Sequence, residues 1–194
     1  MKYAAGKVAG ALFFIAASQF VIGMMLAEAL YPGYSISARY ISDLGVGPSA
    51  IIFNSSVFLM GLLIVIGAYF VQRAFNLKLL TTLLILTAVG AMGVGVFTED
   101  YHTTHTVFSL IAFLFGGLSS MASYRLLKRP FSVIAVILGL MTLGALGLYA
   151  AHAYLGLGVG GMERMIAYPI LMWGAGVGGY LLADSEKPDL QKPR

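Results

Sequence analysis

Two histidines three residues apart, His102 and His105, are the side chains best suited to chemistry in this sequence. Residues three apart are neighbours on one face of a helix, so both imidazoles could bind one ion. Glu99 or Asp100 could add an oxygen ligand, and His152 a third nitrogen. Three protein ligands and one open position are typical of catalytic zinc, which lowers the pKa of a bound water and polarises a carbonyl.

The same histidines allow two other interpretations. In the first, they are interfacial side chains that bond to loop carbonyls and lipid headgroups, because H-x-x-H alone is a weak motif. In the second, paired histidines ligate a haem. His102 and His105 are too close along one helix to ligate opposite faces of one haem, which disfavours that interpretation. The interfacial interpretation is the simplest, and the position of His152 near the same membrane level keeps zinc as the candidate cofactor.

A polar segment between Pro32 and Pro48 contains Arg39, Ser42 and Asp43. Its mixture of polar and apolar residues predicts a short interfacial or re-entrant helix that ends at Gly45. Asp43 could accept the N–H of a ligating histidine or bind the metal itself. Helix capping and loop solvation are the alternative roles of these side chains.

Glu163 and Arg164 come directly before the last apolar run. A guanidinium at this level suits bidentate binding of a carboxylate, such as that of Asp43 or Asp100, or of a lipid phosphate. A glutamate in a first helical turn is also favourable for the helix dipole alone. With Arg39, these two residues are the candidates for binding a substrate headgroup.

The elements that must position these residues are membrane spans. The 194 residues are 59% hydrophobic and only 10% charged, with a mean hydropathy of +0.89. Soluble domains are much less apolar and carry about a quarter charged residues. The first run is also too long for the apolar region of a signal peptide, so we expect it to be retained. The spans are predicted at residues 8–30, 50–71, 79–97, 105–124, 131–154 and 165–183.

These runs predict an all-α, polytopic integral membrane protein with six transmembrane helices in residues 1–183 and a polar tail at 184–194. If both termini lie on one side, that side collects ten of the twelve Lys and Arg residues. Basic residues favour the cytoplasmic side. We therefore expect a multi-pass protein of the cell membrane, with cytoplasmic termini and tail and with its polar site facing the extracytoplasmic side.

Composition also limits the partners. The absence of cysteine excludes thiolate ligands and thiol nucleophiles, and the scattered basic residues form no patch for nucleic acid. Membrane lipids are the expected partners. The Gly-rich segments, including Gly174-x-x-x-Gly178, allow close helix contacts and a possible homo-oligomer.

Three motifs carry a resemblance to a known family. They are Ile41-Ser42-Asp43-Leu44-Gly45, Asp100 with His102 and His105, and Glu163-Arg164-x-x-x-Tyr168-Pro-x-x-x-Trp173. Together they resemble a prokaryotic membrane family called domain of unknown function 998. That family is distantly similar to the eukaryotic Frag/DRAM/Sfk membrane proteins, some of which act in lipid-anchor remodelling or lipid homeostasis. The resemblance implies lipid-linked work.

A weaker similarity is to the alkaline ceramidase and adiponectin-receptor superfamily of intramembrane zinc hydrolases. Their three His, Asp and Ser would fall on His102, His105, His152, Asp43 or Asp100, and Ser42. This similarity implies a catalytic role for Ser42 and the aspartates. The sequence departs from that pattern because it has six spans, not seven, and lacks paired histidines in the last span.

Two hypotheses follow. In the first, the protein is a lipid-directed enzyme, a metal-assisted hydrolase or acyl transferase, with three histidine ligands, an aspartate base and Arg164 at the headgroup. In the second, it is a non-catalytic lipid-binding, sensing or transport protein in which the same residues form a hydrogen-bond network. A tetrahedral cluster of histidine nitrogens would favour the first. A closed ion-pair network beside a lateral groove would favour the second.

Overall fold

The structure is a computed structural model that describes residues 2–184, with the side chains of residues 4–183. The predicted all-α, six-helix architecture is confirmed, and the described part of the chain contains no strand. All six helices are long and apolar enough to cross a membrane. The long helices are α1 (Lys2–Leu30), α2 (Ala50–Phe75), α3 (Lys78–Val96), α4 (His102–Ala122), α5 (Phe131–Ala150) and α6 (Gly158–Asp184). Four short 3-10 helices join them: η1 (Ser42–Gly45), η2 (Gly47–Ser49), η3 (Glu99–Tyr101) and η4 (Ser123–Arg125). The predicted polar tail at 184–194 lies, apart from the backbone of its first residue, outside the described residues.

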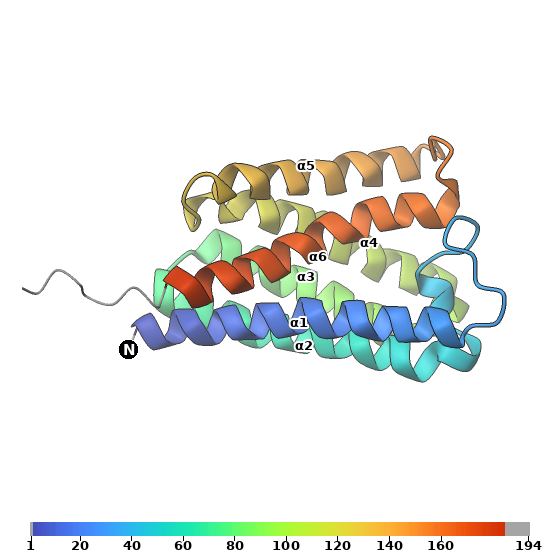
Figure 1. Cartoon of the computed structure of the whole chain (residues 1–194), viewed down its shortest axis with the longest axis horizontal. Coiled ribbons are helices and arrows are strands. Elements are labelled where there is room, and N and C mark those ends of the chain that lie inside the picture. Colours follow the sequence, from blue (N-terminus) through green and yellow to red (C-terminus); the bar gives the residue numbers. More distant parts are fainter. Residues whose placement is uncertain (1, 185–194) are drawn as a thin grey trace, which may run out of the picture.

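The six helices form a closed ring, because each packs on the next along the chain and α6 packs back on α1 (Figure 1). The start of α1 and the end of α6 lie at one end of the ring, here called the basic end. Its connections carry Arg73, Lys78, Arg125, Lys128 and Arg129. The opposite end, called the loop end, holds the connections at residues 31–49, 97–101 and 151–157.

The Gly-rich face that was predicted to allow a homo-oligomer is partly used inside the protein, where α6 packs on α1. A Cβ on Gly178 would lie 2.8 Å from the carbonyl oxygen of Gly10 on α1. Gly178 therefore packs inside the protein, and a homo-oligomer through this seam would displace α1.

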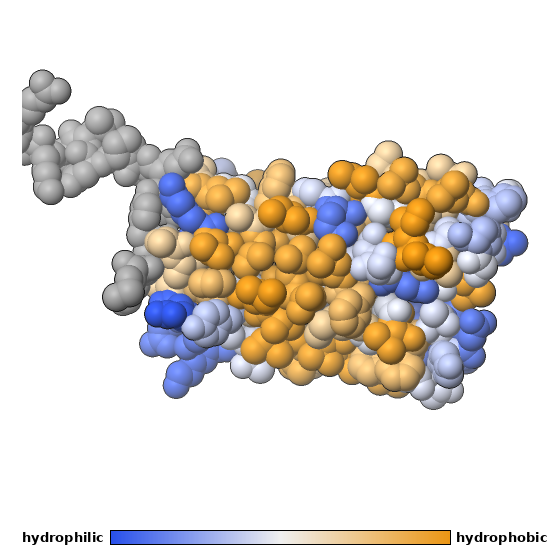
Figure 2. All heavy atoms as spheres, turned by 90° about the horizontal axis from the view of Figure 1, so that it is seen from below, coloured by the Kyte–Doolittle hydropathy of each residue, from blue (hydrophilic) through white to orange (hydrophobic). Residues whose placement is uncertain are grey.

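The outer surface fits a bilayer. Figure 2 shows a broad hydrophobic band across the middle of the molecule, with hydrophilic residues gathered mainly toward the two ends. Large apolar side chains such as Ile51 and Leu79 are 84% and 63% exposed. A helix satisfies its own backbone hydrogen bonds, which is what a hydrocarbon environment demands.

Helix α6 begins at Gly158, earlier than the apolar pattern predicted. Glu163 and Arg164 therefore lie inside the helix and are buried, rather than opening a span at its exposed edge. The first turns of α6 contain three glycines, which lower its mean hydropathy and hide it from a hydropathy pattern. Gly158 has φ +74°, a conformation that suits glycine at the entry to the helix.

The first connection is not the interfacial helix that the sequence predicted. Its only helical parts are two short 3-10 helices, Ser42–Gly45 and Gly47–Ser49, although the first ends at Gly45 as expected. The backbone of the preceding residues bonds to α6 instead: the N–H of Gly160 donates to the carbonyl of Ser37 at 3.1 Å, and that of Ile41 bonds to the Glu163 carboxylate. Tertiary hydrogen bonds have replaced the local ones a helix would need.

Helices α4 and α5 pack closely toward the basic end. A Cβ on Gly139 would lie 2.6 Å from the carbonyl oxygen of Gly117, and the Ser120 hydroxyl donates to the Ala135 carbonyl at 2.6 Å. Toward the loop end a cavity separates the same two helices. The small residues thus decide where the α4–α5 interface is tight and where it is open.

Candidate functional site

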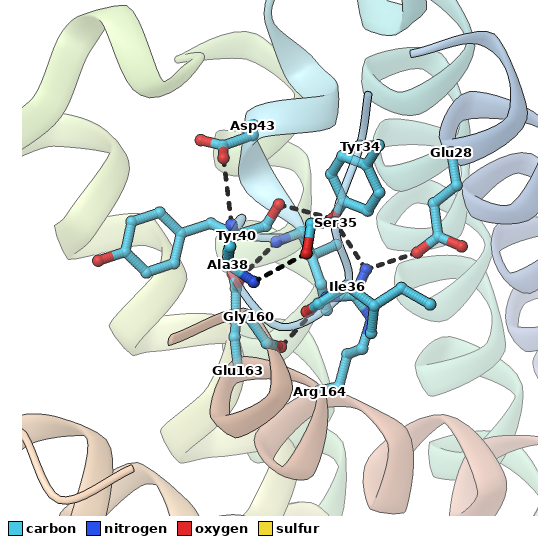
Figure 3. A network of polar contacts seen from close by, with 11 residues as sticks. Glu28, Tyr34, Ser35, Ile36, Ala38, Tyr40, Asp43, Gly160, Glu163 and Arg164 are labelled. Atoms are coloured by element: carbon cyan, nitrogen blue, oxygen red, sulfur yellow. Dashed lines mark hydrogen bonds and ion pairs between the residues drawn. The ribbon is translucent and has the colours of Figure 1, made fainter. Parts of the chain in front are cut away.

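Arg164 lies at the centre of a hydrogen-bond network at the loop end (Figure 3). Its side chain is almost completely buried. Nη2 donates to the Glu28 carboxylate at 2.5 Å and to the Tyr34 hydroxyl at 2.8 Å. Nη1 donates to the carbonyl oxygens of Ile36 and Gly160, both at 3.1 Å. One guanidinium therefore joins α1, the first connection and α6.

Tyr34 extends this hydrogen-bond network to the rest of the first connection. Its hydroxyl accepts from Arg164 and donates to the Tyr40 carbonyl at 2.8 Å. Burial raises the pKa of Tyr34, although the Arg164 bond acts in the opposite direction. The hydroxyl thus keeps the proton with which it bonds Tyr40.

The ion pair of Arg164 differs from the one expected. The sequence suggested Asp43 or Asp100 as the partner carboxylate, and the structure provides Glu28 from α1. Asp43 instead accepts the backbone N–H of Tyr40 at 3.1 Å, with the guanidinium of Arg39 3.8 Å away. The bonds of Nη1 and Nη2 leave only Nε of Arg164 without a hydrogen-bond partner. The guanidinium therefore stabilises the fold of the chain itself.

Glu163, the next residue back along α6, faces a different environment. Its side chain is 8% exposed, and one carboxylate oxygen accepts the backbone N–H of Ile41. Among the described residues it forms no ion pair with a Lys, Arg or His side chain. A buried carboxylate without a cationic partner in a spanning helix is an indicator of function.

The Glu163 carboxylate lines a cavity of about 360 Å³ between the loop-end halves of α4, α5 and α6. The cavity brings together two carboxylates, two imidazoles and two phenols: Glu99, Glu163, His102, His105, Tyr40 and Tyr149. Its apolar wall consists mainly of Leu110, Phe113, Leu146 and Ile166. The arrangement can hold a group that donates hydrogen bonds or carries positive charge, next to an apolar chain.

The three histidines do not come together as metal ligands. His105 is buried with Nδ1 2.8 Å from the Phe97 carbonyl, and His102 is exposed at the start of α4. His152 lies in the exposed α5–α6 connection, where Nδ1 is 3.1 Å from the Tyr154 hydroxyl. No group of three or more His, Asp or Glu side chains in the described chain is arranged to hold a metal ion. His152 lies two residues beyond the end of α5 at Ala150, and the three predicted ligands do not form such a group among the described residues.

His105 is nevertheless held in a defined orientation. A carbonyl oxygen only accepts, so Nδ1 carries the proton in the bond to Phe97. The ring lines the cavity beside the carboxylate of Glu163.

The structure divides the other predicted site residues into two groups. Ser42 is buried and lines the cavity, together with Glu163, His102 and His105. Arg39, Asp43, Asp100, His152 and Arg164 do not contribute to its lining. Arg39 lies over the Tyr31 ring, and Asp100 accepts a hydrogen bond from the Thr98 hydroxyl at 3.2 Å.

Sequence reasoning missed the two tyrosines of the cavity. The rings of Tyr40 and Tyr149 are in edge contact, with their centroids 6.2 Å apart. No spacing in the sequence connects a loop residue with one more than a hundred positions later, so only packing reveals this pair. Glu99 was among the predicted oxygen ligands, whereas the pairing of Glu28 with Arg164 was not predicted.

Comparison with curated proteins and with solved structures finds no match. The predicted distant similarity to the Frag/DRAM/Sfk proteins stays a prediction. A family model described as "Protein of unknown function (DUF998)" matches residues 14–179, which include all three motifs of the sequence analysis. The chain belongs to the DUF998 family.

Proposed function

We propose that this protein binds the ammonium-bearing headgroup of a membrane lipid in the cavity between α4, α5 and α6. The observation that carries the proposal is Glu163, a buried carboxylate that lines the cavity and has no cationic partner in the described chain. The proposal follows the non-catalytic hypothesis, because the ligands that a metal-assisted hydrolase needs are not brought together.

The charge of the cavity supports a cationic ligand. Burying a carboxylate is costly unless a counter-charge or several hydrogen bonds compensate it. Glu163 has one such bond, from Ile41, and Glu99 adds a second carboxylate to the same lining. An ammonium group would supply both the missing positive charge and further N–H donors.

The two tyrosines support the same ligand. The faces of aromatic rings attract cations, and a combination of rings and carboxylates is a known way to bind ammonium groups. Tyr40 and Tyr149 contact each other and line the cavity on the side of α5 and the first connection. The aromatic wall and the carboxylates thus converge on one small volume.

The apolar wall indicates a lipid rather than a free amine. Leu110 lines the cavity and is 49% exposed on the outer face of α4, and Leu146 lines it from α5. A chain attached to the headgroup could therefore leave between α4 and α5 into the bilayer. Because ten of twelve basic residues fall toward the opposite side of the membrane, we place the loop end on the extracytoplasmic side.

The test compares lipids that differ in headgroup. The purified full chain in detergent is titrated with phosphatidylethanolamine, phosphatidylglycerol and soluble ethanolamine, and bound lipid is counted by native mass spectrometry. We expect the binding that depends on Glu163 to be tightest for phosphatidylethanolamine. The Glu163→Gln variant should lose roughly tenfold or more in this affinity, the scale of a charged hydrogen bond.

Two features make the variant informative. Glutamine keeps an oxygen that can accept the Ile41 N–H, so the fold is retained while the charge is removed. Asp100→Asn removes one acid from the same end without touching the cavity and should leave binding unchanged. An equal loss of phosphatidylglycerol binding in Glu163→Gln, or unchanged phosphatidylethanolamine binding by that variant, would refute the proposal. Tight binding of ethanolamine alone would show that the lipid chain is not recognised.

A further inference from the structure

A second cavity, of about 620 Å³, lies at the basic end of the bundle. It is formed by the α2–α3 connection, the first turn of α3, and the last turn of α4 with η4. It lies at the opposite end of the helices from the Glu163 cavity and shares no lining residue with it. Nothing proposed for the loop end accounts for it.

Two cations converge on this cavity. Lys78 and Arg125 both line it, both are exposed, and neither has a hydrogen bond or ion pair within the described chain. Among the described residues, its lining contains no Asp or Glu. Arg73, at the same end, is different: its guanidinium donates to the Tyr69 hydroxyl at 3.2 Å and lies over that ring. A preference for basic residues on one side of the membrane explains their number but not why two of them share a cavity.

A third polar group adds donors to the same space. The carbonyl oxygen of the Asn76 side chain accepts from Gln72 at 2.8 Å, which leaves the amide NH2 of Asn76 free to donate. Asn76 lines the cavity between the two helices. Lysine, arginine and amide donors without an acidic partner suit an anionic oxygen ligand such as a phosphate.

The remaining lining is apolar and reaches the lipid-facing surface. Leu79 is 63% exposed and Tyr124 is 46% exposed, and Leu77, Leu80 and Met121 complete the wall. A free phosphate would use only the polar side of this cavity. A phospholipid would use both sides, with its phosphate at the cations and its chains along Leu79.

We propose that the cavity between the α2–α3 connection and the end of α4 binds the headgroup phosphate of an anionic phospholipid. Lys78 and Arg125 contact the phosphate, and the Asn76 amide donates a hydrogen bond to it. Basic pockets between spanning helices are suited to such headgroups, because each cation near a charged membrane surface adds to the attraction.

The experiment measures lipid affinity of the full chain in detergent by native mass spectrometry, with phosphatidylglycerol, phosphatidylcholine and inorganic phosphate as separate probes. We expect phosphatidylglycerol to bind and to raise the melting temperature. The Lys78→Gln/Arg125→Gln double variant should lose roughly thirtyfold in affinity. Because both side chains are exposed, the variant should fold as the wild type does.

A matched control removes the same charge elsewhere. Arg73→Gln/Arg129→Gln takes two cations from the same end but none from the cavity lining, and should keep its affinity within twofold. An equal loss in both double variants would overturn the proposal in favour of general surface attraction. Equal binding of phosphatidylcholine would overturn it because the net negative charge would not be recognised. Stabilisation by inorganic phosphate without stabilisation by the lipid would overturn the lipid assignment.

Discussion

Glu163 and Arg164 are consecutive residues, but their side chains differ in direction and in the number of their polar partners. Successive helical side chains point about 100° apart, so Arg164 faces α1 and the first connection while Glu163 faces the cavity. All but one of the polar atoms of Arg164 have partners, whereas Glu163 has a hydrogen bond and no ion pair within the described chain. We therefore assign stability to Arg164 and ligand binding to Glu163.

Removing Arg164 should destabilise the protein strongly. Arg164→Gln leaves the Glu28 carboxylate without its cation in a mostly buried site, a change that typically costs about 3–5 kcal/mol. Arg39→Gln breaks a half-exposed pair whose charged atoms are 3.8 Å apart, and should cost at most about 1 kcal/mol. Equilibrium unfolding in mixed detergent and SDS micelles measures both.

Adding Glu28→Gln to the Arg164→Gln variant should recover part of the loss, because it removes the unpaired carboxylate. If the two arginine variants lost equal stability, the Glu28–Arg164 pair would not be the main tie between α1 and α6.

At the scale of elements, the first connection is held on the start of α6 by glycines as well as by Arg164. A Cβ on Gly160 would collide with the carbonyl oxygens of Arg39 and Ile36, and a Cβ on Gly158 with that of Ser37. The backbone of the connection can approach α6 only because these positions lack a side chain. This approach also places Tyr40 and Ser42 at the cavity.

Gly160→Ala should release the first connection from α6. The methyl group would overlap the carbonyl oxygens of Arg39 and Ile36, and the Ile36 oxygen cannot move away without losing its bond from Arg164. We expect faster chymotrypsin cleavage after Tyr34 and Tyr40 in detergent-solubilised protein. Gly144→Ala on α5, where a Cβ would meet nothing within 4 Å, should leave the cleavage rate unchanged. Equal rates in both variants would contradict the close approach.

At the scale of the whole molecule, the ring of six helices separates two polar ends that differ in charge. The loop end holds the buried carboxylate of Glu163 with two partly buried tyrosines, and the basic end holds the cavity lined by Lys78 and Arg125. Under the two proposals, the two ends contact headgroups of opposite charge in the two leaflets. Which leaflet meets which end depends on orientation, which the positive-inside rule predicts.

The chain has no cysteine, so orientation can be tested with single introduced thiols. Thr103→Cys places a thiol at the exposed loop end, and Ala4→Cys places one at the exposed start of α1. We expect a membrane-impermeant maleimide to label only the Thr103→Cys variant in intact cells, and both variants after permeabilisation. Labelling of only the Ala4→Cys variant in intact cells would reverse the proposed orientation.

The sequence by itself determined the class of protein and the level of its polar residues. Spans of about 20 apolar residues are readable because the bilayer imposes their length and helices are the natural way to cross it. The motifs around Asp43, His102 and Glu163 were enough for the family. They also located four of the cavity residues, Ser42, His102, His105 and Glu163.

Only the tertiary structure decided which of these residues meet. Glu28 pairs with Arg164 because α6 packs on α1, and His152 stays apart because α5 ends at Ala150. Tyr149 joins Tyr40 because the first connection folds onto α6 instead of forming its own helix. Side-chain directions change by about 100° with every helical residue. The sequence therefore predicts the membrane level of a residue, but it does not determine which other residue on that level its side chain contacts.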